Sequence, residues 1–194
     1  MKRNTLFKTL LFCSIIVSAF LSSCDNKTQQ FIEGKDVVCD SLLLFSNRQF
    51  TLVSDTIFNK FSVLLWIDST RCSQCELERL DNYEVFSSHC EQIIGKEGRM
   101  KVIISPSEQY GLGLLINDVQ YLNHSFDVII DYKNIFPSLF NCNDRLLMVL
   151  KDDHIVNFYR MENTESDAYK MRECLDYLKQ MYDEDQNNYH DKKH

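Results

Sequence analysis

The sequence predicts an α/β domain in which helices lie on both faces of a mixed, largely parallel central sheet. Between residues 49 and 130, short apolar runs alternate with amphipathic segments, which is typical of parallel strands joined by helices. Two apolar runs near the carboxyl end are separated by only three polar residues and predict an antiparallel hairpin. The 194-residue chain is 44% hydrophobic and 25% charged, as expected of one ordinary folded domain with appended termini.

The amino-terminal 23 residues are predicted to be a targeting segment. Basic residues precede an apolar run over residues 10–21, which matches a signal peptide and falls short of the ~20 apolar residues that span a membrane. An uncleaved membrane anchor is the alternative. The segment ends in Leu21-Ser22-Ser23-Cys24 and resembles the bacterial lipoprotein signal, in which the cysteine receives the lipid and becomes the new N-terminus. The resemblance implies lipidation at Cys24 and a place in the cell envelope, facing the periplasm or the cell exterior.

The rest of the chain divides into a tether, a domain and a tail. Polar residues 24–35 predict a tether between lipid and domain, and residues 36–182 hold the apolar patterns of the domain. Residues 183–194 show no apolar periodicity and predict a disordered polar tail.

The first half of the domain carries two predicted strands and a helix. Residues 49–53 and 61–67 are short runs rich in aromatic and branched side chains, and the second lacks alternation, as in a strand buried on both faces. Capping candidates at Asp68, Ser69 and Thr70 precede a helix with apolar residues at steps of three and four: Leu77, Leu80, Tyr83, Phe86 and Cys90.

The second half continues the alternation and then ends in a hairpin and a helix. Strands are predicted at 101–105 and 126–130, with a helix at 108–122 between them. Residues 145–150 and 154–160 predict the hairpin, and apolar spacing predicts a closing helix from about 165 to 182.

The charge of the chain restricts its partners. The formal net charge is -7, with 28 acidic residues against 21 Lys and Arg. Nucleic acid binding requires a basic surface, so a nucleic acid partner is not expected.

The strongest local motif is Cys72-Ser73-Gln74-Cys75, directly after the predicted buried strand and at the start of a helix. Two cysteines three residues apart in a first helical turn can form a disulfide, and the helix N-terminus favours a thiolate on the first. We therefore predict Cys72 as the nucleophile and Cys75 as the resolving thiol. Arg71 adds a neighbouring positive charge.

With this motif, residues 45–182 resemble the thioredoxin-like family, and more closely the thioredoxin-like lipoproteins of Bacteroidetes-type bacteria. FSVLLWIDSTRCSQCELERL resembles the family's strand, active-site turn and helix, and RLLMVLKDDHIVNFYR resembles its hairpin. The resemblance implies a three-layer α/β/α fold with a mixed central sheet and a C-terminal ββα unit. It also implies thiol-disulfide exchange through the dithiol. We therefore expect a protein or small-molecule disulfide or thiol as substrate, an unidentified redox partner, and contact with a membrane through the lipid anchor.

The chain departs from the family pattern at three places. Arg71 replaces the usual Trp before the first cysteine, and Trp66 stands where a buried acid often assists proton transfer, with Asp68 the nearest acid upstream. The cis-proline expected just before the hairpin is replaced by residues 143–145, Asn-Asp-Arg. Arg145 is expected to face the dithiol, and an arginine here resembles the one with which peroxiredoxins polarise a peroxide.

Other uses of these residues stay open. The cysteine pair would be a permanent structural disulfide if the protein were a non-catalytic binding lipoprotein, and thiol peroxidase activity is a further alternative. No metal site is expected, because His89 and Cys90 diverge on a helix and give Cys72 and Cys75 no matching second ligand pair. No cofactor is predicted. Three cysteines fall on no motif and are expected as buried apolar residues or halves of unassigned disulfides: Cys39, Cys142 and Cys174.

Overall fold

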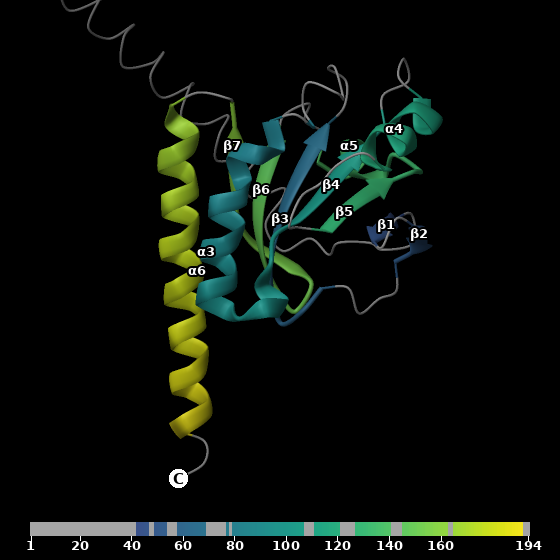
Figure 1. Ribbon diagram of the computed structural model, residues 1–194. Coiled ribbons are helices and arrows are strands. Elements are labelled where there is room, and N and C mark those ends of the chain that lie inside the picture. The colour runs from purple at the N-terminus through teal and green to yellow at the C-terminus, as the bar shows by residue number, and fades with distance from the viewer. Residues whose placement is uncertain are drawn as a thin grey trace, which may run out of the picture.

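The centre of the molecule is a seven-stranded mixed sheet (Figure 1), seen in a computed structural model. The structure describes residues 42–46, 49–53, 58–68, 77, 79–106, 111–120, 127–140, 145–162 and 165–191. The strand order is β2-β1-β5-β4-β3-β6-β7. These strands are β1 (Leu42–Ser46), β2 (Gln49–Leu52), β3 (Phe61–Asp68), β4 (Lys101–Ser105), β5 (Asp127–Asp131), β6 (Arg145–Lys151) and β7 (His154–Met161).

The pairing of the strands confirms a mixed sheet and corrects one expectation. Only the β3–β4 and β4–β5 pairs are parallel, whereas the other four pairings are antiparallel. The expectation of a largely parallel sheet is therefore correct only at its centre. The sequence patterns did not predict β1, which pairs antiparallel with both β2 and β5 and adds a second antiparallel edge.

Three helices cover one face of the sheet and a short helix covers part of the other (Figure 1). The first face carries α3 (Glu84–Ile94), α4 (Gly111–Gln120) and α6 (Ser166–Asp191), and the second carries α5 (Ile135–Phe140). The predicted three-layer α/β/α arrangement is therefore confirmed. Short 3-10 helices cover Arg79–Tyr83 (η1) and Lys96–Gly98 (η2).

The strand that leads to the cysteine motif is buried along its whole length. All eight residues of β3 are buried, because β4 and β6 flank this strand and both sheet faces are covered around it. Its side chains alternate between the two core clusters. Leu65 packs on the face covered by three helices, and Trp66 packs on the α5 face.

The segment after the motif buries the predicted apolar residues but is not one continuous α-helix. The five side chains at helical spacing, from Leu77 to Cys90, are all buried on the same face. However, Leu77 is α-helical, residues 79–83 form a 3-10 helix, and α3 begins at Glu84. Tyr83 precedes α3, and its side chain makes no capping hydrogen bond to the helix.

The hairpin and the closing helix complete the fold. Asp152 and Asp153 form a two-residue turn between β6 and β7, with φ values of 50° and 68°, as the right-handed twist of the strands requires. The helix end predicted near residue 182 is wrong, because α6 continues to Asp191. Its last turns are polar, but Asp185 forms ion pairs with Lys60 and Lys151, which hold the helix against the end of the sheet.

Candidate functional site

Three of the four predicted site residues lie outside the described residues: Cys24, Cys72 and Cys75. The residues on either side of the cysteine motif are described. Asp68 ends β3, and Leu77 is buried in the core beneath the helices. In the sequence, Cys72 follows Asp68 by four residues, and Cys75 precedes Leu77 by two.

Arg145 lies at this same end of the sheet. It is the first residue of β6, and its neighbour Leu146 pairs with Trp66 of β3. Because side chains alternate along a strand, Arg145 shares a face with Leu147, which packs in the cluster that includes Leu77. The predicted arginine is thus on the face from which the segment after the motif packs, and it is only 7% exposed.

A buried hydrogen-bond network lies on the opposite face, at the carboxyl ends of the parallel strands. The Trp66 indole N–H donates to Ser105 Oγ at 2.9 Å, and the Ser105 hydroxyl donates to Asp131 Oδ2 at 3.1 Å. The same carboxylate oxygen accepts the backbone N–H of Phe136 at 2.8 Å. Asp131 therefore joins three strands and the first turn of α5 through one buried carboxylate.

Asp68 adds a second carboxylate to this end of the sheet. It is 7% exposed and pairs in register with Ser105, on the face that carries Trp66. The network thus occupies the face opposite Arg145. In open sheets with parallel strands, ligands and reacting groups commonly bind beyond the carboxyl ends of those strands.

The residues of this network were not identified from the sequence as site residues. Their signal was present, because each parallel strand is an apolar run that ends in a polar residue: Asp68, Ser105 and Asp131. A polar residue at a strand end is also what an ordinary loop boundary provides. Only the structure shows that the side chains meet in the core.

Two thiols lie deep under the three-helix face. Cys90 of α3 and Cys174 of α6 are both fully buried and unpaired. Burial raises the pKa of the Cys90 thiol to about 12, and it raises the pKa of Cys174 well above its ordinary value, with the charge of Cys90 adding to the rise. The raised pKa leaves little thiolate on either sulfur in the folded chain. The prediction that Cys174 is buried is confirmed.

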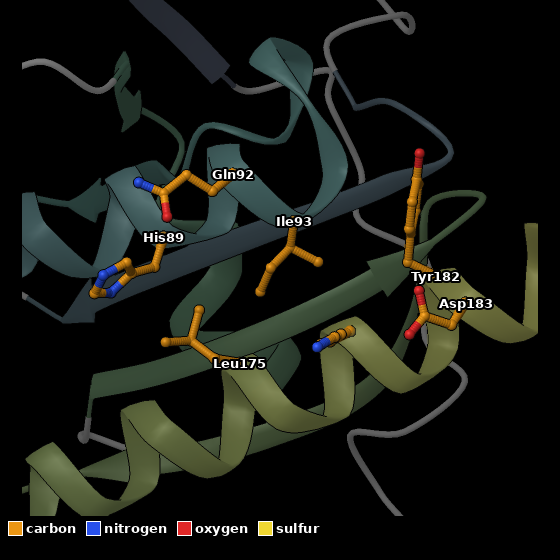
Figure 2. Close-up of a pocket in the computed structure, with 7 residues that line it drawn as sticks. His89, Gln92, Ile93, Leu175, Tyr182 and Asp183 are labelled. Carbon is orange, nitrogen blue, oxygen red and sulfur yellow. The ribbon is translucent and has the colours of Figure 1, made fainter.

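A groove of about 520 Å³ lies between α3 and α6 (Figure 2). Ile93 and Leu175 point into it from the two helices, and polar groups from both helices surround them. Tyr182 at one end of the groove stacks edge-on against Phe61, the first residue of β3. Phe61 begins β3 and Asp68 ends it, so this ring contact lies at the opposite end of the strand from Asp68.

The described residues contain no group of three or more His, Cys, Asp or Glu side chains arranged to hold a metal ion. Among the helices of the described chain, none combines the length and the apolar character needed to cross a membrane.

Comparison with known proteins places the fold. No protein-family model and no curated protein sequence matches the chain. Peroxiredoxin Q of Xanthomonas campestris aligns with a TM-score of 0.51 at 12% identity, over 76% of this chain and 99% of that one. An uncharacterised thioredoxin-like protein of Porphyromonas gingivalis aligns with a TM-score of 0.50 at 12% identity, over 74% of this chain and 92% of that one.

These identities are too low to transfer an activity, but the alignments span nearly the whole of both relatives. They agree with the order of elements, with the mixed sheet and with the hairpin and helix that end the domain. The chain has a thioredoxin-like fold.

Proposed function

We propose that the protein is a lipid-anchored thiol-disulfide oxidoreductase of the cell envelope that acts through Cys72 and Cys75. One observation carries the proposal: two cysteines three residues apart follow the carboxyl end of the buried parallel strand β3 in a thioredoxin-like fold. The similar structures include a peroxiredoxin and a thioredoxin-like protein, and thiol redox chemistry in proteins of this fold supports the proposed exchange activity.

The proposed reaction is a two-step exchange. The Cys72 thiolate attacks one sulfur of a substrate disulfide, forms a mixed disulfide and releases the other sulfur as a thiolate. Deprotonated Cys75 then attacks the Cys72 sulfur and releases the second substrate thiolate. The substrate gains two electrons, the released thiolates take up two protons, and the enzyme keeps a Cys72–Cys75 disulfide. A dithiol redox partner restores the reduced form by the reverse exchange.

The described residues near the motif support its reactivity. Arg145 brings a buried positive charge to the same end of the sheet and to the face on which Leu77 packs. A positive charge favours a thiolate and lowers the pKa of a nearby thiol. On the other face, Asp68 lies four residues before Cys72 and is the nearest acid upstream of it, so its carboxylate is our candidate acceptor for the proton that Cys75 must lose.

The test is a redox titration of the purified protein, with thiol alkylation read by mass spectrometry. Trypsin cleavage after Arg71 and Arg79 leaves both motif cysteines in the single peptide 72–79. We expect a reversible two-electron transition in this peptide, loss of exchange in Cys72→Ser, and a trapped mixed disulfide in Cys75→Ser. If both single variants react equally with iodoacetamide and neither traps an intermediate, the pair is a structural disulfide.

A binding module is the second candidate function, and the groove between α3 and α6 favours it. In that case the protein would bind a partner at a surface remote from β3's carboxyl end and would lack exchange activity. Peroxide consumption that depends on Cys72 and Arg145 would instead assign a thiol peroxidase.

Lipid anchoring is tested separately: Cys24→Ala should abolish acylation, and an unmodified Cys24 in the membrane fraction would contradict the anchor.

A further inference from the structure

We propose that Cys90 and Cys174 form a disulfide that fastens α3 to α6 in the exported protein. The structure records both as thiols, 0% exposed and in one core cluster. The proposal goes beyond the Cys72–Cys75 chemistry. It shares with the proposed function only the export to an oxidising compartment, where disulfides persist.

The two cysteines belong to helices that pack against each other on the same sheet face (Figure 1). Their chain neighbours His89 and Leu175 line the two sides of one groove (Figure 2). Both sulfurs are buried in the same core cluster, and the negative charge of a Cys90 thiolate raises the pKa of Cys174. The packing of the two helices, the shared groove and the shared cluster place both cysteines at the contact between α3 and α6.

Burial determines when such a bond forms. Because the pKa of Cys90 is raised to about 12 in the folded chain, its thiolate is scarce once α6 covers it. Oxidation must therefore precede the packing of α6 on α3 or follow a local opening of this contact.

The oxidant is an exchangeable disulfide, and the step balances. The Cys90 thiolate attacks that disulfide, forms a mixed disulfide and releases one thiolate. The Cys174 thiolate then attacks the Cys90 sulfur and releases the second. Cys90 and Cys174 lose two electrons and two protons in total, and the oxidant is reduced to two thiols.

The experiment refolds the full-length chain, carrying Cys72→Ser and Cys75→Ser, from denaturant with oxidised and reduced glutathione. Free thiols are then blocked with iodoacetamide in denaturant and the protein is digested with trypsin. Cys90 lies alone in peptide 80–96 and Cys174 lies alone in peptide 173–179. We expect these two peptides to be joined. Iodoacetamide labels on both cysteines, or a link from either to a different cysteine, would overturn the proposal.

A stability measurement gives an independent readout. The bond would close a loop of 84 residues (174 − 90), and reducing it should lower Tm by ~10 °C. The matched control is the same chain with Cys90→Ala and Cys174→Ala, whose Tm should not respond to reductant. Equal Tm values with and without reductant in the parent would count against the proposal.

The same peptides, recovered from cells lysed in iodoacetamide, separate this proposal from the proposed function. Joined peptides in cells support both the pairing and the export. If the peptides are joined after refolding but both cysteines are alkylated in cells, the result supports the pairing and contradicts the export. Neither result depends on whether Cys72 and Cys75 are active.

Discussion

On one face of the sheet, α3, α4 and α6 bury a broad and largely aliphatic cluster, while on the other the six residues of α5 set two phenylalanine rings against Trp66 (Figure 1). The ring centroid of Trp66 lies 6.4 Å from that of Phe136 and 5.3 Å from that of Phe140. The first face distributes its stabilisation over many side chains. The second cluster is smaller and contains three packed rings beside one buried carboxylate, so single substitutions at these residues should cost more.

The largest expected effect is that of Trp66→Ala. Removing a fully buried Trp costs about 3–5 kcal/mol, and here it also removes the hydrogen bond to Ser105. The matched control is Leu65→Ala, the adjacent β3 residue on the other face, because it is equally buried. Urea unfolding should show the greater loss for Trp66→Ala. A greater loss for Leu65→Ala would contradict the contrast between the faces.

The next effect concerns the buried carboxylate. Asp131→Ala removes the acceptor of the Ser105 hydroxyl and of the Phe136 N–H, which should cost about 1–3 kcal/mol or somewhat more. Ser105→Ala breaks the same chain of hydrogen bonds but leaves α5 anchored, so it should cost less. Hydrogen exchange in α5 should rise in Asp131→Ala alone. Equal exchange in both variants would mean that Asp131 does not anchor α5.

A smaller effect is expected from the charged residues on the two sheet faces near the end of β3, Arg145 and Asp68. Arg145→Gln removes a positive charge and should raise the pKa of the Cys72 thiol, because the thiolate loses a stabilising neighbour. Asp68→Asn removes a negative charge from the other face and should lower the same pKa. The pH dependence of alkylation in peptide 72–79 measures both. Shifts of the same sign would refute this electrostatic account.

The smallest effect is local and depends on pH. The hydrogen bond from Lys60 lowers the pKa of Asp185, with Lys151 contributing. A carboxyl whose pKa is lowered in the folded state stabilises it above the ordinary pKa of 3.8 and loses that contribution as pH falls through the lowered value. Amide exchange at the end of α6 should therefore rise below about pH 4.

Two variants test this assignment. Asp185→Asn should show faster amide exchange at the end of α6 already at pH 7. Asp183→Asn is the control, because the carboxylate of Asp183 lies in the groove, and it should not show this change. Both ion pairs are exposed at Lys60 and Lys151, so added salt should weaken the effect in the parent. An α6 end that responds to neither pH nor salt would show that other contacts hold it.

The elements that the sequence predicted correctly are those in which the apolar pattern extends over enough residues to be recognised. The buried run of β3, the hairpin of β6 and β7 and the apolar face from Leu77 to Cys90 are confirmed. Helix α5 has six residues, too few for a period of 3.6 to be visible. The last turns of α6 are polar. Their Asp185 pairs with Lys60, which lies 125 residues earlier in the chain.

The candidate site also contains residues that the sequence predicted and residues that it did not. Arg145 was predicted from its place before the hairpin, and the structure puts it at the carboxyl end of β3, on the face where Leu77 packs. Ser105 and Asp131 were not predicted, because their meeting depends on the lateral order of three strands. No pattern within a single strand contains that information.

The place of β3 between β4 and β6 has a consequence for how the chain folds. Its parallel partner β4 follows within about 40 residues, but Phe61 pairs with Lys151, ninety residues later. One edge of β3 therefore stays unpaired until the hairpin of β6 and β7 has formed and docked. Closing so long a loop is slow, since entropy is lost before the contacts form. A chain stopped before β6 would expose this apolar strand to other copies of itself and should aggregate.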